Sequence, residues 1–270
     1  MTSKAVEKAL LDCDSNVPAR QRRGLGQLLS LLVKIAVPKI VRLMRAPDSG
    51  VRIVAIEALG ILGSSSREEV GSHLITSLDD SEPVVRTEAI ALLHKLRLTP
   101  AVKGLLRILK KDKDATVRAA AAEALGDLAV NSVEVRRALL DAALRDADEC
   151  VRSYAGSSLG LIGDNTLVPI LSDAARHERS HRARIGLIGG MYMLGDRVAL
   201  TELLKLLGGN CPTAIVGAVM SEVDFILDRK SSESLRQDKS VLRTILSAAS
   251  ARTPELVPYA GKLLAQLRRV

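Results

Sequence analysis

His177 and His181 are the first residues whose spacing suggests chemistry, because they stand four apart in the segment HERSH with Glu178 between them. On one continuous helix, H-E-x-x-H places two imidazoles on one face for zinc and supplies a carboxylate as general base. The repeat register derived below instead places this segment in a turn between two helices. Arg176 and Arg179 also bring positive charge to the place where a cation would bind. We therefore predict no metal site here, and metal analysis of a His177→Ala variant tests this.

A second pattern with catalytic potential is GSSLG at 156–160, which matches the nucleophile motif G-x-S-x-G. That motif requires a strained turn between a strand and a helix. In this chain it lies inside a helical pattern, and Ser158 occupies a position where related segments have alanine. We interpret Ser158 as a buried structural residue. The sequence contains neither a Walker-type nor a G-x-G-x-x-G phosphate-binding arrangement. We therefore predict a protein that is not an enzyme and has no cofactor.

Arginine and acidic residues recur at a fixed spacing along the chain. A Val-Arg pair is repeated at intervals of 34, 32 and 34 residues, and a further copy, Ala-Arg, follows 32 residues later at Arg184. An acidic residue precedes the arginine by four positions in four copies, where it would cap the helix that contains the arginine. We predict that these charges are structural and hydrogen-bond between equivalent turns of neighbouring repeats. The proposed ladder contains Asp48, Arg52, Glu82, Arg86, Asp114, Arg118, Asp148 and Arg152.

Each copy contains the hydrophobic pattern of two helices. The third, sixth and seventh residues after the arginine are small or apolar, as in Ala55, Ala58 and Leu59, which is a helical stripe. A second amphipathic run precedes each arginine, so each repeat is predicted to be helix A, an acidic turn and helix B. Glycines stand where helix B should end. The predicted helices A are Val37–Arg45, Val70–Leu78, Val102–Lys110, Val135–Leu144 and Val168–Ala175, and the terminating glycines are Gly63, Gly163 and Gly195.

The pattern predicts an all-α, right-handed solenoid of about seven or eight antiparallel helix pairs in a single domain, residues 1–270. Residues 1–35 form an N-terminal cap pair, with Pro18 where the arginine would stand, and residues 36–195 form the regular repeats. Residues 196–270 contain divergent repeats and a C-terminal cap. In this last part we interpret the polar segment Asp228–Ser240 as a linker before a final pair. Atypical ends are expected, because terminal repeats must cover the exposed core.

Composition agrees with this fold. The chain has 270 residues, 47% of them hydrophobic, but only one Phe, three Tyr and no Trp, so the core must be aliphatic. Leu and Ala favour closely packed helices, whereas β-sandwiches are richer in aromatic residues. Cys13, Cys150 and Cys211 lack metal or disulfide spacing, which indicates a reducing compartment. We expect a cytoplasmic protein without a signal peptide or membrane span.

The acid-x-x-Val-Arg-x-x-Ala-x-x-Ala-Leu-Gly pattern, clearest at Asp48–Gly60 and Asp114–Gly126, resembles the HEAT-like repeats named after the phycobilisome lyases. The resemblance extends over residues 36–195. It implies an armadillo-like helical superhelix, and it adds one alternative for the function, a phycobilin lyase-like subunit. Such a subunit would act together with a partner chain. The repeat occurs in lyase subunits, scaffolds and regulators alike, so it specifies the fold rather than the function.

The B helices of such a stack normally line the concave side, which makes their outward positions candidate binding residues. In register, these positions carry four acids and two bases. The fifth and sixth pairs contribute an apolar, glycine-flanked patch, unless the register is off by one and part of it belongs to the core. An exposed tyrosine and methionine commonly mark a protein contact. The predicted patch contains Tyr154, Ser157, Leu161, Ile185 and Met193.

The net charge of +8 must lie elsewhere, on basic ridges of the outer helices and turns. Such a ridge is either a solvated helix face or a nonspecific phosphate-binding surface, since no aromatic side chains stand among the charges for base stacking. Our first hypothesis is a scaffold or adaptor that binds another protein, and the second is a binder of nucleic acid or another polyanion. The candidate polyanion-binding residues are Lys103, Arg107, Lys110, Lys111, Arg179 and Arg182.

Overall fold

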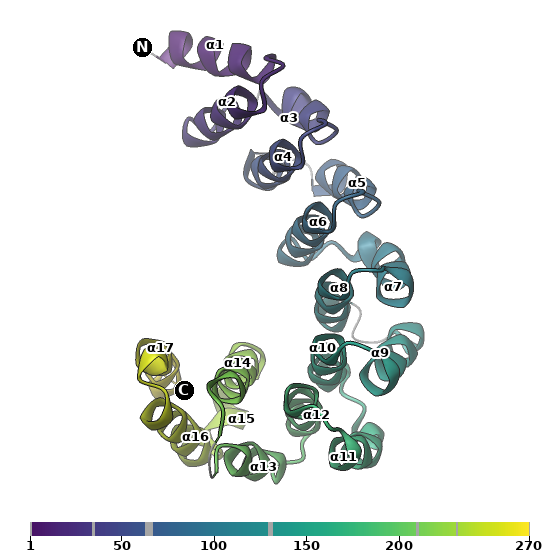
Figure 1. Cartoon of the computed structure of the whole chain (residues 1–270), viewed down its shortest axis with the longest axis vertical. Coiled ribbons are helices and arrows are strands. Elements are labelled where there is room, and N and C mark those ends of the chain that lie inside the picture. The colour runs from purple at the N-terminus through teal and green to yellow at the C-terminus, as the bar shows by residue number, and fades with distance from the viewer. Residues whose placement is uncertain are drawn as a thin grey trace. The chain divides into compact units, whose positions relative to one another are not determined.

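The computed structural model describes residues 2–33, 36–62, 67–128, 132–208, 211–230 and 232–269. These residues form helices joined by short turns, and no strand occurs among them (Figure 1). The α-helices are α1 (Thr2–Cys13), α2 (Pro18–Ser30), α3 (Val37–Leu43), α4 (Ser49–Leu62), α5 (Arg67–Ser77), α6 (Pro83–Lys95), α7 (Val102–Lys111), α8 (Ala115–Leu128), α9 (Val133–Arg145), α10 (Glu149–Leu159), α11 (Val168–His177), α12 (His181–Met193), α13 (Ala199–Leu206), α14 (Thr213–Arg229), α15 (Ser232–Arg236), α16 (Lys239–Arg252) and α17 (Val257–Arg268).

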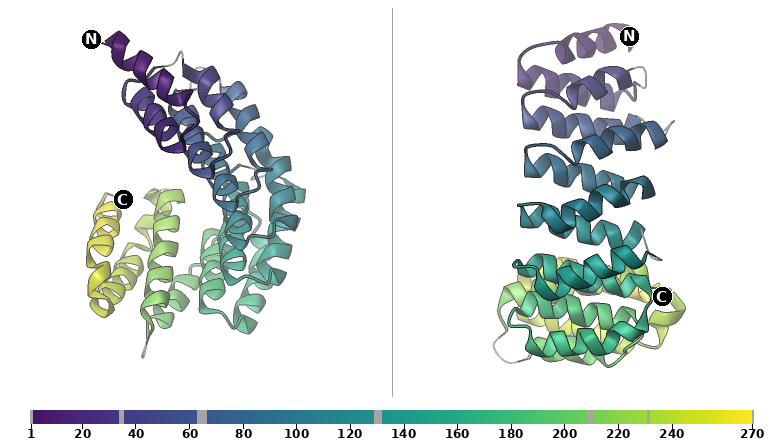
Figure 2. Two further views of the ribbon diagram at one scale, coloured as in Figure 1. Left: turned by 45° about the horizontal axis from the view of Figure 1, so that its top comes forward. Right: turned by 90° about the vertical axis from the view of Figure 1, so that its right-hand side faces the viewer.

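The helices alternate as the sequence predicts. Up to α14, odd-numbered helices are helices A and even-numbered helices are helices B, and α16 and α17 form a final pair. The segment interpreted as a linker contains the short helix α15, so it is not an unstructured connection. The chain divides into two compact units, residues 1–124 and 125–270, with the boundary inside α8. In Figure 2 the helix pairs of the first unit follow one another as stacked layers.

The core of each unit is the predicted aliphatic stripe. In α4, the side chains of Val51, Ala55, Ala58 and Leu59 are at most 1% exposed. The equivalent positions of α6, α8 and α10 are buried as well, including Ser158 of α10. Burial of one such leucine contributes about 2 kcal/mol. Because each pair has its apolar side against the next pair, no single pair has a complete core of its own.

The acids at the predicted cap positions cap three of the B helices. The carboxylate of Asp48 accepts from the Val51 amide at 2.8 Å, and Asp114 and Asp148 make the same contacts at the starts of α8 and α10. Glu82 makes no such bond, since α6 begins at Pro83. A helix of this kind therefore starts without a side-chain cap when proline removes one of the free amides.

Two of the three predicted terminating glycines have the left-handed backbone of a helix C-terminus. Gly163 has φ of 76° and Gly195 has φ of 106°, a region that disfavours side chains. Gly63 lies outside the described residues. After α6, where no glycine stands, Arg97 takes the same conformation with φ of 52°, and Leu32 does so after α2 with φ of 51°.

The repeated arginines connect neighbouring turns, as expected, but their acidic partners are not the predicted ones. Arg52 binds both carboxylate oxygens of Asp80 at 2.7 Å and donates to the carbonyls of Ala46 and Pro47. Arg86 binds Asp112 in the same way at 2.7–2.8 Å. The accepting acid stands six residues before the next arginine rather than four. The capping acids occupy their helix N-termini instead.

The ladder continues in the second unit with the same geometry. Arg152 binds both oxygens of Glu178 at 2.8 and 3.0 Å and donates to the carbonyls of Asp146 and Ala147. In the first unit, Arg118 donates to the carbonyls of Asp112 and Lys113 of its own turn. These bidentate pairs are largely shielded from solvent, with the Arg152 and Glu178 side chains 17% and 12% exposed. Arg52, Arg86 and Arg152 thus each fix their own turn and hold the next turn against it.

Candidate protein-binding surface

The H-E-x-x-H segment does not form a zinc-type arrangement, because the helix is interrupted within it. His177 ends α11 and His181 begins α12, with Glu178 in the intervening turn. The carboxylate of Glu178 accepts from Arg152 and from the Ser180 amide. Burial opposes its ionisation, but these hydrogen bonds outweigh burial and hold the pKa of Glu178 below its usual range. In the described part of the chain, no group of three His, Cys, Asp or Glu side chains is arranged to hold a metal ion.

The G-x-S-x-G segment lies in α10 rather than at a strand-to-helix turn. Ser158 is fully buried, and a Cβ placed on Gly126 would approach its Cβ to 2.7 Å. The hydroxyl is therefore enclosed between two helices and inaccessible to a substrate. The prediction that Ser158 occupies a core position is confirmed.

In each unit the helices B have one side turned away from the helices A, and we call this side the B-helix face (Figure 1). In the second unit this face contains the predicted patch, of which Tyr154 is 37% exposed and Leu161 and Met193 are half-buried. Ser157 and Ile185 are only 3% and 1% exposed. The prediction that these two side chains are accessible is wrong. Ile185 belongs to the core, which is the alternative that the sequence left open.

Helix α14 covers part of the B-helix face of the second unit. It lies beside α12 in Figure 1, and its buried Glu222 accepts a hydrogen bond of 2.8 Å from the Ser157 hydroxyl of α10. At the C-terminal end of α14, Arg229 binds Asp127 of α8 at 2.8 Å, with both side chains less than 20% exposed. The Arg229 guanidinium also lies 4.1 Å from the ring centre of Phe225. Ser157 is therefore buried by a helix that its own repeat does not contain.

Glycines allow α10, α12 and α14 to approach one another closely. A Cβ on Gly186 would lie 2.6 Å from the carbonyl carbon of Ser153, and a Cβ on Gly190 would lie 3.0 Å from that of Gly156. On the neighbouring face of α12, a Cβ on Gly189 would lie 2.7 Å from Cγ of Glu222. Most contacts at Gly186 and Gly190 are with backbone atoms, which cannot rotate away. The glycines of α12, which flank the predicted patch in the sequence, are buried packing residues.

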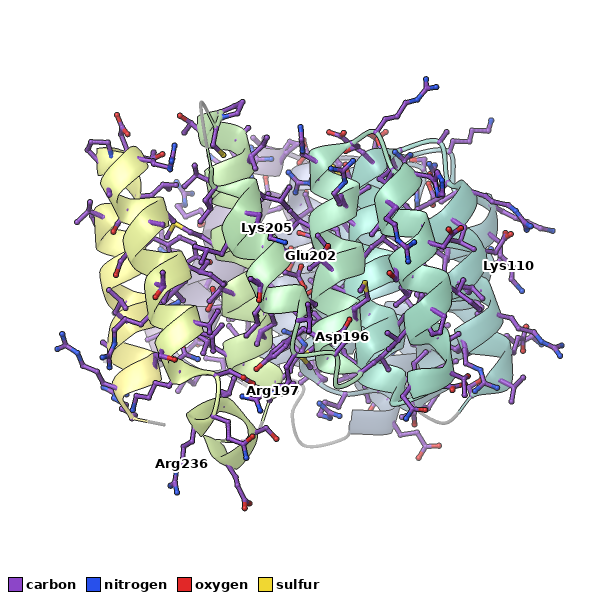
Figure 3. The ribbon with its side chains drawn as sticks, turned by 90° about the horizontal axis from the view of Figure 1, so that it is seen from below. Lys110, Asp196, Arg197, Glu202, Lys205 and Arg236 are labelled. Carbon is purple, nitrogen blue, oxygen red and sulfur yellow. The ribbon has the colours of Figure 1, made fainter. Side chains whose placement is uncertain are left out.

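A second polar cluster connects α12 to the C-terminal helices. The hydroxyl of Tyr192, fully buried, donates to Asp238 at 2.9 Å, and Arg197 donates to the same carboxylate at 2.7 Å. Figure 3 shows Arg197 next to Asp196, in the turn that follows α12. Lys230 lies 4.3 Å from the centre of the Tyr192 ring, and burial lowers its pKa. These contacts fix the start of α16 against α12.

The B-helix face of the first unit has a different character. On α4, Val54 is half-buried and Ile61 is 55% exposed, and on α6 Val84 is 57% exposed. Glu57 of α4 and Glu88 of α6 lie on the same face. Partial burial, and then the neighbouring Glu57 carboxylate, raise the pKa of Glu88 despite the opposing effect of Lys95. This face therefore combines accessible aliphatic side chains with two carboxylates that repel each other.

The protein-family model for HEAT repeats matches residues 3–94, 71–141 and 136–219 of the sequence, which together include most of the chain. The chain belongs to the HEAT-repeat family. Among solved structures, it is similar to a chain in the complex of CpcE and CpcF of phycocyanin lyase from Nostoc sp. PCC7120, with a TM-score of 0.53 and 20% identity over 86% of this chain and 94% of that one. This likeness is evidence for a common fold.

A second solved structure found to be similar is that of human deoxyhypusine hydroxylase in complex with glycerol. It has 15% identity over 100% of this chain and 99% of that one, with a TM-score of 0.39. A search of curated proteins finds no match to this HEAT-repeat chain.

The candidate polyanion residues lie on outer surfaces of the HEAT repeats. Lys103, Lys110 and Lys111 are exposed on α7, and Figure 3 places Lys110 at the margin of the view. Arg107 pairs with Asp79 and so contributes no free charge. The groove beside these residues, about 620 Å³, is lined by four basic and four acidic side chains and therefore has no positive surplus. Arg179 and Arg182 are exposed at the turn before α12 and in its first residues.

Two sets of residues were not predicted from the sequence, the acids that pair with the ladder arginines and the ion pair of Arg229 with Asp127. The ladder acids Asp80, Asp112 and Glu178 had a detectable signal, since each stands six residues before an arginine of the repeat. The pair of Arg229 and Asp127 had no such signal, because 102 residues separate them and the C-terminal repeats lack the Val-Arg marker.

Among the helices that the structure describes, none combines the length and the hydropathy that a membrane-spanning helix needs.

Proposed function

We propose that this HEAT-repeat chain is a non-catalytic scaffold or adaptor that binds another protein on its B-helix faces. The observation that supports the proposal is the exposure of Ile61 and Val84 on the first unit and of Tyr154 on the second, on helices whose other sides are closed. Exposed aliphatic and aromatic side chains of this kind are typical of protein contacts. The similar fold from Nostoc is one chain of a two-chain complex, which agrees with a protein partner.

Tyr154 provides the test. The protein is immobilised and exposed to extract of its native organism, with the captured proteins compared between low and high salt. Capture through apolar side chains tolerates salt and should fall when Tyr154 is replaced by alanine, with helicity unchanged. Ile170→Ala is the matched control, because Ile170 is 43% exposed but lies on the outer helix α11. Equal capture by the wild type and the Tyr154 variant would contradict a role for this patch.

The same experiment distinguishes the two alternative functions. A polyanion binder that uses Lys103, Lys111, Arg179 and Arg182 would lose affinity steeply as salt increases, because counterion release drives such binding. A phycobilin lyase-like subunit, the alternative that the Nostoc neighbour suggests, would bind a partner chain and promote attachment of a bilin to an acceptor protein. Bilin transfer with purified partner and acceptor tests that alternative directly.

A further inference from the structure

The proposed scaffold function leaves open which kind of protein segment binds, and the B-helix face of the first unit restricts the choice. Its central carboxylates, Glu57 and Glu88, make no ion pair or hydrogen bond among the described residues. Carboxylates at the turns of the same unit do so regularly, as Asp48, Asp80 and Asp112 show. Partial burial and then the Glu57 carboxylate raise the pKa of Glu88, and a cation added between the two carboxylates would favour the charged form of Glu88.

Aliphatic side chains surround these carboxylates. Val54 and Ile61 lie one turn before and one turn after Glu57 on α4, and Ala91 lies one turn after Glu88 on α6. Ile61 and Ala91 are exposed and Val54 is half-buried. Lys95 is the one base that follows on this side of α6, and it only partly offsets the repulsion at Glu88. A complementary segment would carry apolar side chains together with positive charge.

The second unit contains a segment of this chemistry on its own B-helix face, although at a different position of the repeat. Asp127, which stands on the B-helix face of α8, is bound by Arg229 of α14, and Phe225 lies one turn before that arginine with its ring against the guanidinium. One B-helix face of this protein therefore already binds a helix in which arginine follows an apolar residue by four positions. In the first unit no described helix supplies such an arginine to Glu57 and Glu88.

We propose that the B-helix face of α4 and α6 binds a helix of a partner protein in which arginine follows an apolar side chain by one turn. The guanidinium lies between Glu57 and Glu88, and the apolar side chain packs on Val54, Ile61 and Ala91. This inference rests on the proposed scaffold function and specifies the chemistry of its ligand. A bidentate guanidinium suits two carboxylates better than an ammonium does.

The test uses a fluorescent, alanine-based helical peptide with two Phe–Arg pairs, four residues apart within each pair, on one face. A sister peptide has citrulline in place of both arginines, which keeps the shape and removes the charge. Fluorescence anisotropy should show about tenfold tighter binding of the arginine peptide to the full chain, a difference expected for direct charge pairing at an interface. Absence of binding at millimolar protein, or equal binding of both peptides, would overturn the proposal.

Glu57→Gln with Glu88→Gln should remove that tenfold preference. The matched control, Glu68→Gln with Glu202→Gln, removes the same two charges from exposed positions of the outer helices α5 and α13 and should change affinity by less than about twofold. Equal losses in both variants would mean that net charge alone attracts the peptide, and the proposal would be wrong.

Capture from native extract separates this inference from the scaffold function. A partner retained equally by the wild type and by the Glu57 and Glu88 double variant would leave the scaffold function intact and contradict the arginine-helix inference. A wild-type protein that retains no partner would contradict the scaffold function itself.

Discussion

The two units are built from the same repeat, yet their B-helix faces differ in what covers them. In the first unit, α4 and α6 leave Ile61, Val84 and the carboxylates of Glu57 and Glu88 without a covering helix among the described residues. In the second, α14 covers Ser157 with Glu222 and binds Asp127 with Arg229. The repeat pattern therefore sets how helices stack, whereas a few glycines and one arginine decide whether a face remains accessible.

The largest expected effect comes from removing the glycine contact that brings α10 and α12 together. In Gly186→Ala, the new methyl group collides with the backbone of Ser153, and the two helices must separate. We expect the free energy of unfolding of the second unit to fall by about 3 kcal/mol. Urea denaturation followed by circular dichroism measures this change.

Gly217→Ala in α14 is the matched control, because no heavy atom lies within 4 Å of the added carbon. It should stabilise by about 0.5–1 kcal/mol through helix propensity. If the two substitutions behave alike, close glycine packing is not what distinguishes the second unit.

The ladder is common to both units, so its loss should cost a similar amount in each. Arg86→Ala and Arg152→Ala each leave a mostly buried carboxylate and two turn carbonyls without their donor. We expect each substitution to lower the free energy of unfolding by about 2 kcal/mol, measured by thermal and urea denaturation. A markedly larger effect in one unit would mean that the ladder contributes to the difference between them.

Acid should remove this contribution in a defined pH range. The pKa of Glu178 is lower in the folded protein than its ordinary value of 4.5. The stabilisation is therefore complete well above pH 4.5 and decreases as the pH falls through the folded pKa. The difference in unfolding free energy between the wild type and Arg152→Ala should be constant from pH 6 to 7 and shrink below about pH 4.5. If the difference in unfolding free energy persists at pH 2–3, the stabilisation by Arg152 comes from its carbonyl contacts alone and not from Glu178.

Arg229→Ala tests whether α14 needs its ion pair to cover the second unit. Asp127 would lose a partner while it remains 15% exposed, and we expect a loss of about 1 kcal/mol. Hydrogen exchange should show faster opening at the C-terminal end of α14 and unchanged protection of α4 and α6. Faster exchange throughout the first unit would contradict the idea that the Arg229 ion pair stabilises only the second unit.

The smallest effect is expected at the left-handed residue after α2. Leu32 has φ of 51° and is 66% exposed, so Leu32→Gly relieves strain and removes little packing. We expect a gain of about 0.5 kcal/mol in the first unit, measured by thermal denaturation. Leu31→Gly is the control, because Leu31 has ordinary helical backbone with φ of −92°, and it should destabilise. A loss in both variants would show that Leu32 is held by packing instead.

The sequence predicts the helix pairs well, because alternation of aliphatic stripes and the Val-Arg marker are local signals. Ala55, Ala58 and Leu59 are buried as the stripe predicts, and Asp48, Asp114 and Asp148 cap their helices. The covered patch could not be predicted in the same way. Burial of Ser157 depends on Glu222, which is 65 residues away in a repeat without the marker. The three glycines of α12 were the available sign that another helix packs closely there.

The spacing of the ladder has a consequence for protein engineering. Arg52, Arg86 and Arg152 each pair with the acid that stands six residues before the next arginine, so each of these pairs connects one repeat to the following one. Excision of residues 81–112 would join Asp80 to Lys113, leave the partner of Arg52 in place, and put Asp80 six residues before Arg118. We therefore expect that a repeat can be removed or duplicated without loss of these pairs when each cut falls directly after the accepting acid.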